Sequence, residues 1–287
     1  MLTILFDGIA YGMLLFVLAV GLAVTMGLMN FINLAHGAFA MVGGYITVLL
    51  MQRLDVPFLA CLPLAFIGSA LLGAVLERTL YRPLYRKPHL DQVLFSIGLV
   101  FMAVAAVDYY VGSTQQITQL PPWLKGRTEI GSLGMGHYRL FIIAVCAALT
   151  IALQFVLART RFGSRLRASV DDQRVAAGMG INVNLVFLST FAFGSGLAGL
   201  GGALGAEVLG LDPSFPLKFM IYFLIVVAVG GTSSITGPLL AALLLGVADV
   251  AGKYYIPKMG AFIVYSLMIV ILLWRPNGLF VRQGGKA

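Results

Sequence analysis

Few polar residues in this chain have the type and spacing to do chemistry, and the first group follows the first long apolar run. Residues 27–37 read GLMNFINLAHG, so two amides and one imidazole stand among apolar side chains. Such groups are destabilising in an apolar environment unless they form hydrogen bonds. One interpretation places Asn30, Asn33 and His36 on the polar waist of a transport path. The other is local: Asn33 caps a helix beginning near Leu34, and His36 bonds a neighbouring carbonyl. Residue types favour the local interpretation and leave the first one open.

A second group of hydroxyl side chains follows a pair of glycines late in the chain. Residues 230–238 read GGTSSITGP, and Thr232, Ser233 and Ser234 are candidates for the same path. An intramembrane serine protease would need a serine paired with a histidine. His36 is the histidine near membrane depth, and Ser233 is not in a Gly-x-Ser-x-Gly frame. We therefore expect no catalytic residues here, and Pro238 fits the first turn of a helix.

Long apolar runs must position these groups. About 20 helical residues cross a hydrocarbon core of about 30 Å, and backbone in lipid must be helical or form a closed barrel. The runs do not alternate in polarity as barrel strands do. The chain of 287 residues is 60% hydrophobic and 10% charged. We expect an all-α, polytopic transmembrane helical bundle of about 8–10 spans. The spans are roughly 3–27, 36–51, 57–77, 92–112, 139–158, 185–206, 217–231, 237–252 and 259–274.

Two of these spans are short and follow a break rich in Gly, Asn or Ser. They are 36–51 and the span after residues 230–234, and they occupy corresponding positions in the two halves of the chain. Membranes tolerate broken or re-entrant helices where these line a cavity. The paired breaks favour an internal duplication with broken or re-entrant helices.

The basic residues give the chain an orientation. The net charge is +8, and twelve of the 19 Lys and Arg residues fall in segments 78–92, 159–184 and the tail from 275. The positive-inside rule places these segments in the cytoplasm and the N-terminus outside. Loops 113–137 and 207–217 then lie outside. The positive charge therefore reflects topology, and no nucleic acid is expected as a partner.

The longest basic segment reads RTRFGSRLRASVDDQRVAAGMGIN over residues 159–182. Ser164 is placed to cap a short helix that runs to about Ala177, and Gly178 and Gly180 stop it. A solvated surface helix is one interpretation. A docking helix for a cytoplasmic partner is the other, because a loop of this length has little other structural purpose.

Three motifs in a fixed order now resemble a known family. They are NLAHG at 33–37, the Arg-rich loop ending in GIN at 180–182, and GGTSSITGP at 230–238. The chain is similar in these motifs, and essentially throughout, to permeases of branched-chain amino acid ABC importers, most of all the LivH-type subunit. Residues 77–84 and 276–278 extend the resemblance.

The resemblance implies a single transmembrane permease domain over residues 1–287, with a cytoplasmic coupling loop at about 159–184. It implies that a helix from Arg167 to Gly178, with Asp171, Asp172 and Arg174, contacts an ATPase. The implied partners are a second permease of LivM type, two ABC ATPase subunits and a periplasmic binding protein, in the bacterial inner membrane. ATP and Mg would be used in the ATPase subunits, so no cofactor or metal is expected in this chain.

Two alternatives stay open. Relatives of this family import urea or short amides, so the substrate is not fixed. A self-sufficient secondary transporter or channel would need buried membrane charges for ion coupling. The candidates are Asp7, Asp108, Glu207 and Asp249, and all of them stand close to span ends. We expect a largely apolar passage without a deep charged pocket.

The orientation leads to the first testable prediction. In a background without Cys61 and Cys146, a cysteine at Thr128 should react with an impermeant thiol reagent added to intact cells. A cysteine at Ser164 should react only after the cells are opened. The reverse pattern would contradict the whole topology.

Overall fold

A computed structural model describes residues 1–29, 31–130, 133–231, 234–275 and 278–279. Helices dominate this part of the chain. They are α1 (Leu2–Met29), α2 (His36–Leu54), α3 (Phe58–Leu76), α4 (His89–Val111), α5 (His137–Arg159), α6 (Arg161–Asp171), α7 (Gln173–Gly178), α8 (Val183–Leu209), α9 (Phe215–Gly230), α10 (Thr236–Tyr255) and α11 (Gly260–Trp274). A π-helical turn (Glu77–Tyr81) and a 3-10 turn (Arg82–Arg86) follow α3, and 3-10 turns also cover Pro122–Leu124 and Pro257–Met259.

The helices confirm the expected all-α membrane fold. Seven of those described, namely α1–α5, α8 and α10, are long and apolar enough to cross a membrane. The apolar helices α9 and α11 are shorter. Together they coincide with the nine spans inferred from the sequence.

The boundaries of these helices follow from local backbone chemistry. Pro57 and Pro88 stand directly before α3 and α4, where the missing N–H of proline has no helical partner to lose. Gly112 and Gly231 follow α4 and α9 with φ values of +98° and +80°. Glycine adopts this backbone conformation without the strain that a Cβ would add.

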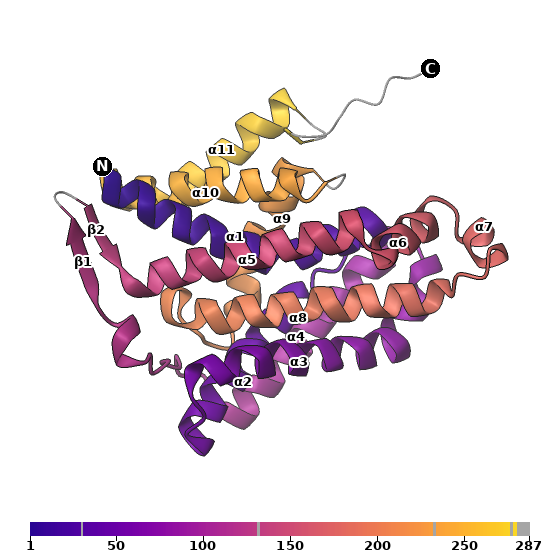
Figure 1. Ribbon diagram of the computed structural model, residues 1–287, viewed down its shortest axis with the longest axis horizontal. Coiled ribbons are helices and arrows are strands. Elements are labelled where there is room, and N and C mark those ends of the chain that lie inside the picture. The colour runs from indigo at the N-terminus through magenta and orange to yellow at the C-terminus, as the bar shows by residue number, and fades with distance from the viewer. Residues whose placement is uncertain (30, 131–132, 232–233, 276–277, 280–287) are drawn as a thin grey trace.

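The molecule is elongated, and its two ends differ (Figure 1). We call the outer end the one that carries the N-terminus and the antiparallel hairpin of β1 (Arg127–Ile130) and β2 (Leu133–Gly136). The amide of Gly134 in this hairpin donates to Thr3 Oγ1 at 3.2 Å. We call the inner end the one that carries α6 and α7. The loops expected to lie outside meet at the outer end, where the Gln116 amide donates to the Leu211 carbonyl at 2.7 Å.

The core is built on α1 and α8, whose small residues let neighbouring backbones approach. Gly202 of α8 lies against the backbone of Ala40 in α2, and a Cβ at Gly202 would overlap the Ala40 carbonyl oxygen. Gly8 and Gly12 of α1 pack against α10 in the same way. Without a hydrophobic driving force between helices in lipid, such close packing is the main source of association. The glycine-rich stretch of α8 is thus a packing surface, as its small-xxx-small spacing predicts.

The helix α2 begins inside the bundle rather than at the end of α1. Its first residue, His36, contacts the carbonyl of Leu18, which lies 11 residues before the end of α1 at Met29. That separation corresponds to about 16 Å along the helix axis. The chain after Met29 therefore returns toward the middle of the bundle before α2 starts. The first of the two expected breaks is re-entrant in this sense.

The structure corrects the sequence-based account of residues 159–184. One helix capped by Ser164, or one helix from Arg167 to Gly178, is wrong: the segment forms α6 and α7 with a break at Asp172. The α6 cap is Thr160, whose Oγ1 accepts a hydrogen bond from the Gly163 amide at 3.4 Å. Asp172 caps α7, because its Oδ1 accepts from the amides of Arg174 and Val175 at 2.8 and 3.0 Å. Asp prefers cap positions to helix interiors, because its side chain accepts hydrogen bonds from nearby backbone amides. The predicted stop at Gly180 is confirmed by its φ of +81°.

The packing of α8 leads to the second prediction. Gly202→Ala should lower the stability of the purified chain, because the new methyl group must push α2 and α8 apart. Overpacking of this kind destabilises a protein by about 1–3 kcal/mol. Gly98→Ala in α4 is the matched control, since a Cβ there meets no atom within 4 Å. Equal thermal unfolding midpoints for the two variants would contradict this account.

Candidate functional site

Asn33 of the first polar group lies in a buried turn that hydrogen bonds hold in place. Asn33 is 1% exposed, and its Oδ1 accepts from the amide of Ala35 at 3.1 Å and from the hydroxyl of Tyr81 at 3.0 Å. The prediction that Asn33 caps a helix near Leu34 is wrong, because α2 begins at His36 with Ala35 as its N-cap and no side-chain cap bond. The first contact instead lies within the turn that precedes the cap. The second comes from 48 residues away and fastens the turn to the segment after α3. Asn33 thus stabilises the backbone where it is not helical.

Further contacts fix the same turn. The Ile32 amide donates to Gln92 Oε1 at 3.2 Å, and Gln92 Nε2 donates to the Lys87 carbonyl at 3.1 Å. The ring of Phe31 meets Tyr81 and Tyr85 edge-on, with both pairs of ring centroids 5.4 Å apart. Buried backbone polar groups need partners of this kind, and α4 supplies one of them through Gln92.

His36 lies one turn farther along, at the start of α2. It is 2% exposed, and its Nε2 lies 2.9 Å from the Leu18 carbonyl oxygen. The ring fits because residue 21 is a glycine, and a Cβ there would lie 2.7 Å from the imidazole. His36 thus bonds a carbonyl, as the local interpretation predicts, but that carbonyl lies 18 residues away on α1 and not beside it in the chain. These contacts leave the transport-path interpretation of Asn33 and His36 as a prediction, and Asn30 lies outside the described residues.

The second polar group lies at the inner end, at the start of α10. Thr232 and Ser233 lie outside the described residues. Ser234 is exposed, and its Oγ accepts from the Gly237 amide at 3.3 Å. Pro238 stands in the first turn of α10, as the sequence predicts.

A cavity brings Ser234 together with a residue that the sequence assigned to a different role. We call it the inner cavity; it has a volume of about 390 Å³ between α1, α5, α6 and the start of α10. Its lining includes Ser234, Thr236, Arg167, Gln154 and the apolar Val24. Arg167 therefore lines a cavity as well as lying on the protein surface. It lies at a junction between the Arg-rich segment and the second break.

The remaining coupling candidates are on α6 and α7. Arg167 donates from Nη1 to the Leu157 carbonyl, which fastens α6 to the end of α5. Asp171, Asp172, Arg174 and Gly178 are exposed at the inner end. Leu166 and Ala176 turn inward and are buried. The two short helices thus form a charged surface held to the bundle by apolar contacts.

The structure also contains a group that sequence analysis did not assemble. At the outer end, Asp7 of α1 pairs with Arg139 of α5, and Asp249 pairs with Lys253 one turn later in α10 at 2.5 Å. The four residues line one cavity of about 310 Å³, which we call the outer cavity. Asp249 and Lys253 are four residues apart, a spacing that brings two side chains together on one face of a helix, so the sequence indicates this pair. Nothing in the sequence indicates that Asp7 of α1 meets Arg139 of α5. We expected no deep charged pocket, and the outer end has a charged cavity.

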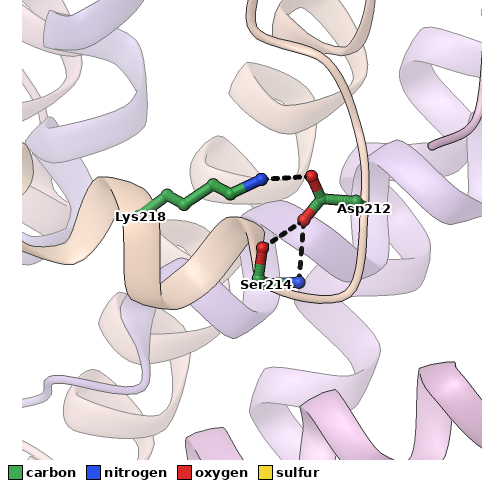
Figure 2. A network of polar contacts seen from close by, with 3 residues as sticks. All are labelled: Asp212, Ser214 and Lys218. Carbon is green, nitrogen blue, oxygen red and sulfur yellow. Dashed lines mark hydrogen bonds and ion pairs between the residues drawn. The ribbon is translucent and has the colours of Figure 1, made fainter. Parts of the chain in front are cut away.

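A second polar network holds the loop between α8 and α9 at the same end (Figure 2). Asp212 Oδ1 accepts from the amide and hydroxyl of Ser214 at 2.8 and 2.5 Å, and Oδ2 pairs with Lys218. Burial by itself would raise the pKa of Asp212, but the hydrogen bonds from Lys218 and Ser214 and the charge of Lys218 outweigh it and lower the pKa. The network therefore stabilises the loop at neutral pH, and this contribution is lost only as the pH falls through the lowered pKa.

No group of three or more His, Cys, Asp or Glu side chains suited to a metal ion occurs among the described residues.

Comparisons with known proteins place this geometry in context. A family model described as "Branched-chain amino acid transport system / permease component" matches residues 4–272. The chain is 29% identical to the high-affinity branched-chain amino acid transport system permease protein BraD of Pseudomonas aeruginosa, over 97% of this chain and 95% of that protein. It is 26% identical to the corresponding LivH protein of Escherichia coli K12, over 97% of this chain and 94% of LivH. It is also 27% identical to LivM of Salmonella typhimurium, over 93% of this chain and 68% of LivM. No solved structure matches the chain.

The bonds of Asn33 lead to the third prediction. Tyr81→Phe removes one hydrogen bond and should reduce the free energy of unfolding by about 0.5–1.5 kcal/mol. Asn33→Leu should have a larger effect, because it leaves the Tyr81 hydroxyl and the Ala35 amide buried without an acceptor, at about 1–3 kcal/mol each. Chemical denaturation in detergent measures both.

The double variant provides the control. If Asn33 and Tyr81 act as a pair, adding Tyr81→Phe to Asn33→Leu should change stability less than Tyr81→Phe does alone. Additive effects would contradict the assignment of this hydrogen bond.

Proposed function

This chain belongs to the family of permease components of branched-chain amino acid transport systems, and we propose on that basis that it is the membrane-spanning subunit of an ATP-driven importer of branched-chain amino acids. The observation that carries the proposal is the family match over residues 4–272, which reaches from the first to the last of the apolar helices. The names of the relatives favour this substrate over urea or short amides.

The chain is expected to work as one part of a larger complex. It is similar to both LivH and LivM over nearly its whole length, which supports a pairing of two homologous permeases. We propose that ATP hydrolysis with Mg takes place in two separate ATPase subunits, as the resemblance to ABC importer permeases implies. A periplasmic binding protein would deliver the substrate to the outer end, and the complex would lie in the bacterial inner membrane.

We assign the ATPase contact to the exposed surface of α6 and α7. Movement of α6 would act directly on the bundle, because Arg167 is bonded to the end of α5 and lines the inner cavity beside Ser234. The inner cavity also touches Val24 of α1. A shift of the coupling surface would thus reach α1, α5 and the start of α10 together, which suits an alternating-access mechanism.

We assign the transport path to the region of the two breaks. The start of α2 lies inside the bundle, beside Leu18 of α1. At such a position the N-terminal amides of a half-helix favour a negatively charged group such as a substrate carboxylate. Asn30, Asn33 and His36 on the first break, and Thr232, Ser233 and Ser234 on the second, remain the candidates. For Asn33, a path role requires that Asn33→Leu reduce uptake by more than it reduces the amount of the subunit in the membrane.

Uptake by the reconstituted complex tests the proposed function. The chain with its partner subunits and binding protein, placed in proteoliposomes, should accumulate L-leucine, L-isoleucine and L-valine only when ATP is present. Excess urea or acetamide should not compete. Uptake without ATP, or by this chain alone, would instead support a self-sufficient transporter.

Coupling leads to the fourth prediction. Asp171→Lys should reduce substrate-stimulated ATP hydrolysis, because it reverses an exposed charge on the ATPase-facing surface. Exposed loop charges contribute little to the fold, so the subunit should still insert. A reversal at Asp172 would also remove the α7 cap, so Asp172→Ser, which keeps a capping oxygen, is the better second variant. Normal stimulation in Asp171→Lys would contradict the docking role.

A further inference from the structure

We propose that the outer cavity binds the transported amino acid as a zwitterion, so that it is a first station for substrate inside this subunit. The proposal rests on the function proposed above and adds a location and a chemical basis for recognition. The cavity lies between α1, α5, α8, α9 and α10, at the end where the substrate would arrive.

The charges of the outer cavity match the two charges of an amino acid. Asp7 and Asp249 are acidic, and Arg139 and Lys253 are basic, so both signs line one space. A carboxylate accepts hydrogen bonds from an ammonium group, and a guanidinium or ammonium donates to a carboxylate. A ligand that carries both an ammonium group and a carboxylate can therefore bind to all four side chains.

Unused hydrogen-bonding capacity marks where the ligand ammonium would bind. Asp249 is 1% exposed, and its Oδ2 faces Lys253 while its Oδ1 has no hydrogen bond of normal geometry. Asp7 Oδ1 is buried without a partner. Tyr11 of α1 interacts electrostatically with Asp249, and the Tyr222 hydroxyl of α9 also has a hydrogen-bonding interaction with this carboxylate. A buried carboxylate oxygen without a donor is destabilising, so a cationic group that fills the cavity would be bound favourably.

The basic partners are accessible enough to bind the other end of the ligand. The side chains of Arg139 and Lys253 are 43% and 56% exposed. Each has donors beyond those used by its own aspartate, because Arg carries five N–H groups and Lys three. They stand at the mouth of the outer cavity, so a ligand would place its ammonium inward and its carboxylate outward.

The rest of the lining suits an aliphatic side chain. Ala10, Leu14, Ile142, Leu209, Phe219 and Val250 complete the wall. The volume of about 310 Å³ lies at the lower limit of typical small-molecule pockets, which are about 300–1,000 Å³. The cavity is therefore sized for a small metabolite and has an apolar surface beside its charged one.

A wider opening leads to this cavity from the hairpin side. A neighbouring cavity of about 580 Å³ lies between α1, the hairpin and the start of α5. It shares Asp7, Arg139 and Val208 with the outer cavity. A substrate released at the outer surface would meet Arg139 first and then the buried carboxylates.

Direct binding to the purified full-length chain in nanodiscs tests the proposal. Radiolabelled L-leucine should bind weakly and saturably. Leucinamide, which lacks the carboxylate, and 4-methylpentanoate, which lacks the ammonium group, should compete at least about tenfold less well than leucine itself. Equal competition by all three compounds, or no leucine binding at all, would overturn the proposal.

Two variants of different kinds locate the site. Asp249→Asn keeps the size of the side chain and removes the charge, and Val208→Trp fills the mouth from a partly exposed position. Each should weaken leucine binding by about tenfold or more. The control for Asp249→Asn is Asp108→Asn, which changes an exposed acid near the C-terminal end of α4. The control for Val208→Trp is Val75→Trp on an exposed face of α3. Thermal unfolding of each variant shows that the protein is folded.

The outcomes separate this proposal from the proposed function. If the complex imports leucine while Asp249→Asn and Val208→Trp bind and import it as the controls do, the outer cavity is not a substrate site and the importer function stands. If the complex imports no leucine, the proposed function itself fails.

Discussion

A polypeptide backbone that leaves helical geometry within a membrane must find its hydrogen bonds inside the protein, and this constraint governs the structure. The return of the chain between α1 and α2 is the clearest case. Asn33 and Gln92 accept hydrogen bonds from backbone amides that a helix would have satisfied itself, and the Tyr81 hydroxyl donates to the Asn33 side chain and holds it in place. Those three residues come from different segments, so the break draws α2, the turn after α3 and α4 together. The start of α2 inside the bundle, beside Leu18 of α1, depends on them.

The same constraint applies to charge. At the outer end Asp249 is buried and Asp7 is partly buried, and each is stabilised by a basic partner close by. Both carboxylates line the outer cavity, and each keeps an oxygen that its basic partner does not bind. This remaining acceptor capacity is the basis of the proposed ligand recognition. Buried charge in a membrane protein is destabilising, and it is characteristically associated with function for that reason.

Close helix packing connects the two ends. Gly202 against α2, and Gly8 and Gly12 against α10, leave little space between the backbones of the core. A core of this density moves as a unit rather than deforming gradually. The inner cavity, where Arg167 of α6 meets the start of α10, is the place where a partner acting on the coupling surface would move that unit.

The sequence by itself determined the nine apolar helices, the difference in charge between the two ends and the positions of both breaks. These are local properties: hydrophobic length, the distribution of Lys and Arg, and Gly or Pro at helix ends are read over a few residues at a time. It placed the cap of the Arg-rich helix at Ser164, whereas Thr160 caps α6, since either hydroxyl satisfies the local rule. Only the tertiary structure brought Tyr81 to Asn33 and Arg139 to Asp7, and placed Arg167 and Ser234 on the lining of one cavity. Each of these pairings joins residues far apart in the chain, and they exist because particular helix faces pack together, which local periodicity does not specify.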